Sequence, residues 1–143
     1  MPPSSLQLSQ FQLDMIIAHA RAHPDVEVVG LLGGQGAKVM GVYALNNNSP
    51  RPEVSFLLKD QEFLDAFFEM EKRGWDLVAI YHSHPRGFSA SPSPTDIANA
   101  NYPEALNLIV SFDRQGQQPV ARAFQIVDER VREVELEVVS GGT

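Results

Sequence analysis

Short runs of apolar and β-branched residues recur along this chain, and they restrict it to a fold built around a sheet. These runs cover residues 26–32, 38–45, 77–81, 106–112, 120–126 and 131–139. An apolar run of four to eight residues between turn signals is typical of a strand that is buried on both faces. Residues 54–58 predict one more short strand.

Two segments carry helical periodicity and predict helices at about residues 10–23 and 61–73. Pro24 should end the first helix, because a residue before proline avoids the helical conformation. Asp60 is expected to cap the second helix, and Gly74 suits its C-terminal end. A shorter helical stretch is predicted over residues 96–100.

The chain of 143 residues has the length of one ordinary domain, so we expect a single domain over residues 1–143. Turn signals at 113–119 and 128–130 predict that the last three strands form an antiparallel meander. The predicted fold class is therefore α/β (α+β), with a mixed, mainly antiparallel sheet flanked by two main helices. The first few residues and residues 140–143 read as loose ends.

Charge and cysteine content exclude several classes of protein. The net charge is −7 and the basic residues are scattered, which argues against a nucleic-acid or anionic-membrane partner. The chain has no cysteine, so it forms no disulfides, and any zinc site must use histidine and carboxylate ligands. Neither a signal peptide nor a membrane-spanning run is apparent, and we expect a cytoplasmic protein.

The segment YHSHPRGFSASPSPTD carries a candidate metal site. Side chains alternate along a strand, so His82 and His84 should point the same way, with their Cα atoms roughly 6.5–7 Å apart. The loop over residues 85–95 contains prolines and a glycine and can bring Asp96 back to this pair. Two histidines and one carboxylate leave one position of a zinc ion open, as catalytic zinc sites require.

Structural interpretations compete with this one. A His-x-His pair can simply be the polar end of a strand, and Ser93 to Asp96 fit a helix cap with serine at N-cap and the acid at N3. His19 and His23 have helical i, i+4 spacing, but no glutamate stands between them as the helix-borne zinc-protease motif requires. We interpret that second pair as structural, since histidine near a helix C-terminus favours the helix dipole.

Glu27 is the candidate general base. It stands inside the apolar run EVVGLLGG, where a carboxylate is costly unless it is paired or functional. The alternative is an ion-paired acid at the end of a strand.

Taken together, EVVGLLGG, YHSHP and SPTD resemble the JAMM (MPN-plus) family of zinc metalloproteases. The family pattern is a glutamate before a Gly-Leu-Leu-like strand, then His-x-His-Pro, then Ser-x-x-Asp. The similarity covers nearly the whole chain, and the predicted elements come in the family's order. The resemblance implies an MPN/JAB-like fold with layering similar to that of cytidine deaminases.

The resemblance also implies a role for each matching residue. His82, His84 and Asp96 match the three zinc ligands. Glu27 matches the acid that takes a proton from the attacking water and later gives it to the leaving amine. Ser93 matches the serine that helps to stabilise the tetrahedral oxyanion.

One spacing departs from the family pattern. Eight residues separate His84 from Ser93, where the family usually has seven. With the usual seven residues, Pro92 would stand at the position of the serine and Thr95 at that of the aspartate, and proline has no side-chain group that could take the serine's role. We interpret the difference as a one-residue insertion within 85–92, with Ser91 as the alternative serine.

The function implied is hydrolysis of an amide or isopeptide bond after the C-terminal Gly-Gly of a ubiquitin-like or sulfur-carrier protein, as in small prokaryotic members of the family. The tail should enter along a strand edge. Two alternatives stay open at this point: a non-catalytic MPN scaffold, which should carry no stoichiometric zinc, and a hydrolase of a small non-protein amide.

Overall fold

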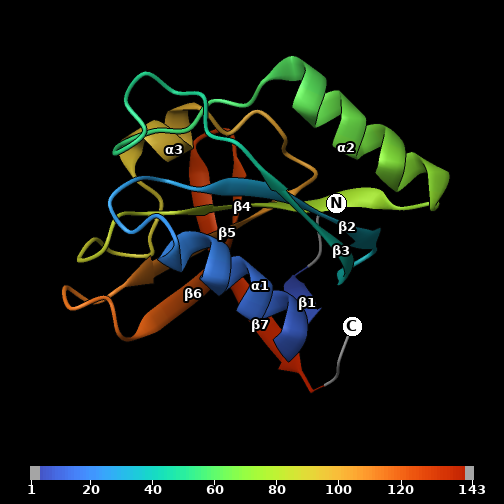
Figure 1. Cartoon of the computed structure of the whole chain (residues 1–143). Coiled ribbons are helices and arrows are strands. Elements are labelled where there is room, and N and C mark those ends of the chain that lie inside the picture. Colours follow the sequence, from blue (N-terminus) through green and yellow to red (C-terminus); the bar gives the residue numbers. More distant parts are fainter. Residues whose placement is uncertain (1–3, 141–143) are drawn as a thin grey trace.

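A computed structural model describes residues 4–140, and the remaining residues at each end, including most of the predicted loose ends, lie outside the described part (Figure 1). The strands are β1 (Ser5–Ser9), β2 (Val29–Gln35), β3 (Lys38–Leu45), β4 (Asp76–Ser83), β5 (Leu106–Phe112), β6 (Pro119–Val127) and β7 (Arg130–Val139). The helices are α1 (Gln10–Arg21), α2 (Asp60–Lys72) and α3 (Pro94–Ala98).

The strands form one mixed sheet in the order β1-β3-β2-β4-β5-β6-β7, and β1 also pairs with β7, so the sheet closes on itself. Four neighbouring pairs are antiparallel, including the predicted meander of β5, β6 and β7. The β4–β5 pair is parallel, as are both pairs that β1 makes. The predicted mixed, mainly antiparallel sheet is confirmed.

The two main helices pack against opposite sides of the strands β2 and β4. Leu32 belongs to the core cluster that includes Ile16 and Ala20 of α1. Its neighbour Leu31 belongs to the cluster that includes Met70 of α2. Since side chains alternate along a strand, an apolar run buried on both faces allows β2 to serve both helices at once. Figure 1 shows the sheet between these helices.

Strand β1 was not predicted, because the first residues were interpreted as a loose end. Leu6 and Leu8 are fully buried, and the strand pairs in parallel with β7 from the other end of the chain. The alternation Leu-x-Leu is the signal that could have identified it. Its partner is distant in the sequence, so no local turn signal announced the pairing.

Three smaller predictions need correction. Residues 54–58 form a turn and an irregular segment rather than a strand. The amide of Leu57 bonds the side chain of Asn47 at 3.0 Å, in place of a ladder along a strand. Asp60 is the first helical residue of α2, and the capping position is Lys59, which makes no side-chain cap. The strand predicted from residue 26 begins at Val29, so Glu27 lies just before β2.

Candidate metal centre

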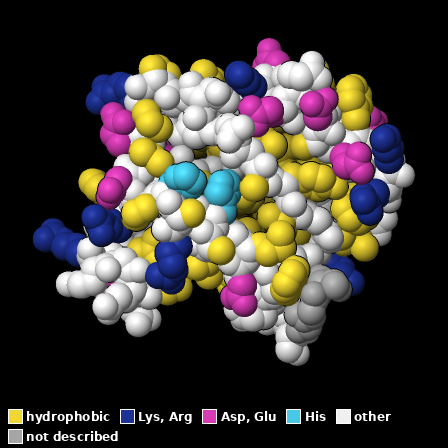
Figure 2. All heavy atoms as spheres, in the orientation of Figure 1, with side chains coloured by type: hydrophobic (Ala, Val, Ile, Leu, Met, Phe, Trp, Pro, Cys, Tyr) yellow, Lys and Arg dark blue, Asp and Glu magenta, His cyan; other side chains and the backbone are white. Residues whose placement is uncertain are grey.

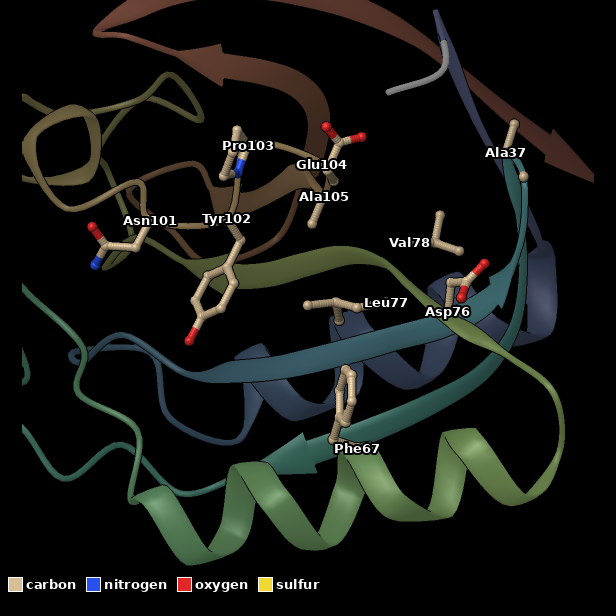
Figure 3. Close-up of a pocket in the computed structure, with 11 residues that line it drawn as sticks. Ala37, Phe67, Asp76, Leu77, Val78, Asn101, Tyr102, Pro103, Glu104 and Ala105 are labelled. Atoms are coloured by element: carbon tan, nitrogen blue, oxygen red, sulfur yellow. The ribbon is translucent and has the colours of Figure 1, made fainter. Parts of the chain in front are cut away.

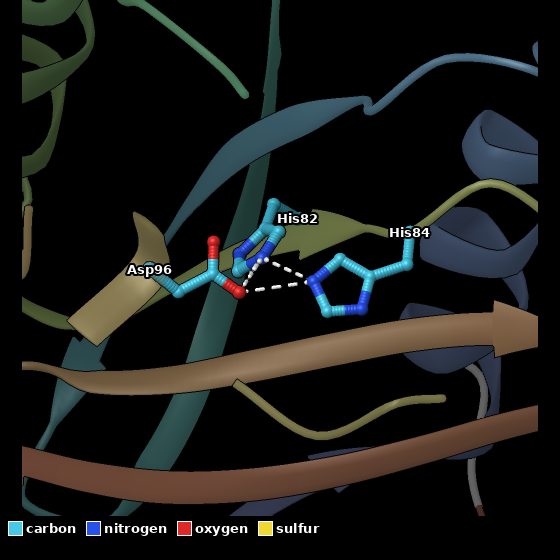
Figure 4. Close-up of side chains that lie close together, drawn as sticks. All are labelled: His82, His84 and Asp96. Atoms are coloured by element: carbon cyan, nitrogen blue, oxygen red, sulfur yellow. Dashed lines mark hydrogen bonds and ion pairs between the residues drawn. The ribbon is translucent and has the colours of Figure 1, made fainter. Parts of the chain in front are cut away.

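Three buried side chains converge where β4 ends and α3 begins (Figure 4). The Nε2 atoms of His82 and His84 lie 3.3 Å apart, and the Oδ2 atom of Asp96 lies 3.2 Å from the first and 2.9 Å from the second. The exposed fraction of each residue is at most 9%. These three atoms form a compact triangle, which is compatible with one metal ion that contacts all three.

Neighbouring groups orient the two imidazole rings. The Nδ1 atom of His84 lies 2.6 Å from the carbonyl oxygen of Ser89. Because a carbonyl only accepts, Nδ1 carries a proton; Nε2 donates to Asp96 Oδ2 at 2.9 Å when the ring is also protonated there, and it is the nitrogen left to bind a metal when the ring is neutral. The ring of His82 packs against Phe56, with centroids 4.9 Å apart. Its buried Nδ1 atom has no hydrogen-bond partner among the described residues.

Asp96 is both a member of this cluster and the N3 residue of a capping box. The Ser93 amide donates to Asp96 Oδ2 at 2.9 Å, and Ser93 Oγ accepts from the Asp96 amide at 3.1 Å. The structural interpretation of this segment is therefore confirmed, and it is compatible with a metal site. The cap uses Ser93 Oγ as an acceptor, which leaves its O–H free to donate.

Ser91, the alternative serine, faces a different set of groups. Its Oγ atom accepts from Ser89 Oγ at 3.1 Å and from Arg122 Nη1 at 2.8 Å. Of the two candidate serines, Ser93 is therefore the one that bonds directly to a member of the cluster.

Backbone contacts hold Glu27 opposite His84. Val29 pairs with His82, and one step further the amide of Ser83 donates to the carbonyl of Val28 at 3.0 Å, so the next pair along this register is Glu27 with His84. The Val28 amide in turn donates to Ser83 Oγ at 2.9 Å.

Two more contacts fix the backbone of Glu27 itself. Its amide donates to the carbonyl of Pro52 at 2.7 Å, and its carbonyl accepts from Asn47 Nδ2 at 2.9 Å. The side chain is only 3% exposed, and its Oε1 atom has no hydrogen-bond partner among residues 4–140. The alternative interpretation of Glu27 as an ion-paired acid at a strand end therefore does not describe this carboxylate.

The surroundings of the two carboxylates, Glu27 and Asp96, shift their pKa values in opposite directions. Burial is the main cause that raises the pKa of Glu27 to about 7, the negative charge of Asp96 raises it further, and His84 opposes both. Burial also disfavours ionised Asp96, but hydrogen bonds from His82 and His84 outweigh it and hold that pKa far below its usual range. Burial lowers the pKa of His84, whereas its hydrogen bonds to Asp96 and Ser89 raise it above the usual value. One acid is therefore fixed as an anion, while the other exchanges a proton near neutral pH.

A groove of about 640 Å³ leads to the cluster. It reaches His82 and Asp96, and Phe56, Phe63 and Tyr102 contribute aromatic walls. A second cavity of about 630 Å³ continues beyond Tyr102 to Phe67 of α2 and Leu77 of β4 (Figure 3). The two hollows share Tyr102, whose ring stacks on that of Phe63 with centroids 5.5 Å apart.

The other histidine pair lies on α1 and the residues after it. His19 Nδ1 lies 2.7 Å from the hydroxyl of buried Tyr81, and the ring of His23 is exposed beside it. On the side of the molecule drawn in Figure 2, histidine side chains reach the surface among hydrophobic side chains. His19 thus ties α1 to β4, which is a structural role, although it acts through the Tyr81 hydroxyl rather than the helix dipole that the sequence suggested.

Sequence reasoning missed the groups that hold the site in place. The carbonyl of Ser89 orients His84, the hydroxyl of Ser83 holds the segment before β2, and Asn47 binds the carbonyl of Glu27. A backbone carbonyl leaves no signal in a sequence. The sequence could have indicated a role for Ser83, because a residue between the two histidines of a strand must point its side chain away from both.

The chain is similar to known proteins along most of its length. Residues 10–127 match the family model of prokaryotic homologs of the JAB domain. The CysO-cysteine peptidase of Mycobacterium tuberculosis is 34% identical over 129 residues, which are 89% of this chain and 86% of that protein. A probable TtuB-protein conjugate cleaving protease of Thermus thermophilus is 40% identical over 85 residues. That match covers 59% of this chain and 56% of the relative.

Solved structures agree with this assignment. The solution structure of protein DSY2949 from Desulfitobacterium hafniense superposes with a TM-score of 0.82 at 35% identity, covering 95% of this chain and 94% of that one. A structure described as "JAMM: A Metalloprotease-like Zinc Site in the Proteasome and Signalosome" has a TM-score of 0.58 at 22% identity, which shows the fold alone, and covers 94% of this chain and 97% of that one. The chain therefore belongs to the prokaryotic JAB family.

Proposed function

We propose that this protein is a zinc-dependent peptidase that hydrolyses an amide or isopeptide bond after the C-terminal Gly-Gly of a ubiquitin-like or sulfur-carrier protein. The observation that carries the proposal is the buried triangle of two imidazole nitrogens and one carboxylate oxygen with an unpartnered acid beside it. No part of a scaffold needs that arrangement, because burying such groups without a ligand is unfavourable.

His82, His84 and Asp96 are the proposed zinc ligands. Ligand atoms 2.0–2.2 Å from a tetrahedral zinc lie about 3.3–3.6 Å apart. The three separations of 2.9, 3.2 and 3.3 Å are close to that range, so small movements of the side chains would suffice. A bound zinc ion would supply Lewis-acid activation of the attacking water and of the scissile carbonyl.

Glu27 is the proposed general base and acid. In the metal-free protein, burial raises the pKa of this carboxyl to about 7, which suits a group that accepts a proton from the attacking water and then donates it to the leaving amine. Its Oε1 atom has no hydrogen-bond partner among residues 4–140, so no other group competes for its lone pairs.

Ser93 is the proposed oxyanion donor. Its hydroxyl hydrogen is not used by the helix cap, and its amide is fixed to Asp96. A donor that is held in place before the reaction stabilises the developing charge without reorganisation. Ser91 is the matched control, because its hydroxyl oxygen contacts Arg122 instead of the cluster.

The proposed partner class rests on the relatives and on the groove. Both relatives carry names that describe cleavage at a protein carrier, one at CysO–cysteine and one at a TtuB–protein conjugate. A groove of about 640 Å³ that ends at His82 and Asp96 suits a narrow Gly-Gly tail. None of the helices among the described residues is long and apolar enough to cross a membrane. The cytoplasmic location and the domain extent of 1–143 stay predictions.

The test is cleavage of a ubiquitin-like carrier that is extended past Gly-Gly, with added zinc, with a chelator, and with Glu27→Gln. We expect chelator-sensitive cleavage after Gly-Gly, and loss of turnover in Glu27→Gln with zinc content retained. Ser93→Ala should lower kcat by roughly 10²–10³, whereas Ser91→Ala should leave it within about twofold. A Glu27→Gln variant that cleaves at the parent rate refutes the assigned mechanism.

Two other results favour the alternatives. A protein that purifies with one zinc but does not cleave the carrier would favour a small-molecule amide as substrate. A protein that holds no zinc and does not cleave would favour the scaffold interpretation.

A further inference from the structure

The two histidines of the candidate metal centre are held in different ways. A histidine that binds a metal through one ring nitrogen almost always donates a hydrogen bond from the other. His84 does so, because its Nδ1 atom bonds the carbonyl of Ser89 at 2.6 Å. The Nδ1 atom of His82 is buried and has no hydrogen-bond partner among residues 4–140. Another contact must set the direction of the His82 ring, since the torsion about its Cβ–Cγ bond has broad minima.

Phe56 supplies that contact from outside the cluster. The centroids of the Phe56 and His82 rings lie 4.9 Å apart, and the ring planes are 36° from parallel. Phe56 also packs against the core cluster that includes Leu31 of β2 and Ile80 of β4. An aromatic face that is itself held by the core restricts the imidazole by packing, where a hydrogen bond would restrict it by direction.

The position of Phe56 depends on one side-chain amide. Residues 46–59 form neither helix nor strand, so no ladder of backbone hydrogen bonds holds this segment. Asn47 Nδ2 donates to the carbonyl of Ser55 at 3.0 Å, and Asn47 Oδ1 accepts from the amide of Leu57 at 3.0 Å. These two bonds fix the residues on either side of Phe56.

The same amide fixes the segment relative to the strand that carries His82. Asn47 Nδ2 also donates to the carbonyl of Glu27 at 2.9 Å. The next residue, Val28, exchanges two hydrogen bonds with Ser83, of 3.0 and 2.9 Å. Because Ser83 directly follows His82 in β4, Asn47 connects the aromatic ring to the strand end on which the histidine stands.

Resting on the proposed function, we infer that Asn47 is a positioning residue of the metal centre. It holds Phe56 against His82, so that the imidazole keeps Nε2 directed at the other two members of the cluster (Figure 4). Phe56 lines the groove but Asn47 does not. Loss of the Asn47 amide therefore removes no contact from a tail in the groove, and its effect on the metal passes through the residues that it holds.

The experiment is a zinc titration of the full chain against a chromophoric chelator, with no substrate present. Asn47→Ala should lower the affinity for zinc about tenfold, the lower end of the range for groups that orient a metal ligand. Phe56→Ala should lower it by a similar factor. The double variant should also lose about tenfold rather than a hundredfold, because both changes release the same imidazole.

Three further variants complete the titration. Asn48→Ala is the matched control and should keep the parent affinity, since the exposed side chain of Asn48 bonds the carbonyl of Asn46 at 3.3 Å. Phe56→Tyr keeps the aromatic ring and should also keep the parent affinity. Phe56→Leu keeps an apolar side chain without a flat face and should lose about tenfold, which tests the contact even where Asn47→Ala does not fold.

A second readout separates positioning from a general loss of stability. Cobalt(II) in place of zinc absorbs visible light in bands that depend on the number and geometry of its ligands. At saturating cobalt, Asn47→Ala should shift or weaken these bands, and Asn48→Ala should reproduce the parent spectrum. A substitution that only destabilises the fold would leave the spectrum of the folded, saturated protein unchanged, and circular dichroism shows that each variant is folded.

The outcomes distinguish this inference from the proposed function. A parent-like zinc affinity in Asn47→Ala, losses that multiply in the double variant, or unchanged cobalt bands overturn the inference and leave the proposed function intact. The titration uses no substrate, so a parent protein that holds zinc but does not cleave the Gly-Gly carrier overturns the proposed function alone. A parent protein that holds no zinc overturns both.

Discussion

Glu27→Gln should stabilise the metal-free protein at alkaline pH, although it removes the proposed general base. The glutamate is 3% exposed, with one carboxyl oxygen that lacks a partner, and its pKa rises from 4.5 to about 7. The folded protein therefore holds the proton of Glu27 more tightly than the unfolded chain does. Its contribution to stability is complete below about pH 4.5 and is lost as the pH rises through 7.

The size of the effect follows from the shift in pKa. A rise from 4.5 to about 7 amounts to roughly 3 kcal/mol between the two protonation states. A neutral glutamine keeps a similar shape and has no charge to desolvate, so the variant should gain up to about that much at pH 8.5. With a urea m-value of about 2 kcal/mol per molar, the unfolding midpoint should move upward by roughly 1–2 M.

The assay is urea unfolding at 25 °C with a chelator present, at intervals between pH 4.5 and 8.5. The parent and Glu27→Gln curves should nearly coincide at pH 4.5 and diverge through pH 7. Glu137→Gln, an exposed change on β7, should track the parent throughout. Curves for the parent and Glu27→Gln that stay parallel over the whole range would refute the desolvation of Glu27, and with it the physical basis of its proposed proton transfer.

Other substitutions test the fold and the metal centre. Gly30→Ala should destabilise the protein by about 2–4 kcal/mol in urea unfolding, because its Cβ would lie 2.2 Å from the ring of Tyr81 and displace that ring from its hydrogen bond. Ser9→Ala removes the cap of α1 and should lower Tm by about 2–4 °C in a calorimetric scan. Asp96→Asn keeps an oxygen for the Ser93 amide, so circular dichroism should stay unchanged while bound zinc, measured by elemental analysis, falls from one equivalent to nearly none.

Local patterns predicted most of the fold. Period-2 and apolar runs identified six of the strands, and helical periodicity and Pro24 predicted the position of α1. Closure of the sheet depends on β1. The sequence did not predict this strand, because five residues with two leucines give a weak signal. Residues 54–58 were wrongly predicted to form a strand, because a short run with hydrophobic residues does not show which groups take its backbone hydrogen bonds. Its hydrophobic residues Phe56 and Leu58 pack against a core cluster, but side chains of the preceding loop take its backbone hydrogen bonds.

The candidate site was predicted from residue types, but its geometry was not. Spacing alone suggested that His82 and His84 share a side, and the structure brings both Nε2 atoms to Asp96. The Ser-x-x-Asp pattern favoured Ser93 in the sequence, and the longer loop left Ser91 as the alternative. The hydrogen bonds of their hydroxyls separate them, since one bonds to Asp96 and the other to Arg122.

The helix cap and the metal site, the two competing interpretations of the Ser93–Asp96 segment, share the carboxylate of Asp96. The Asp96 Oδ2 atom accepts from the Ser93 amide while it faces both imidazoles, so the hydrogen bond that begins α3 also fixes the direction of the carboxylate. A helix of five residues has little stability of its own. The cap stabilises the first turn of that helix, and the contacts of Asp96 with the two buried imidazoles attach the helix to the end of β4. An extra residue in the preceding loop is then tolerated, because these contacts, rather than the loop length, set where the acid stands.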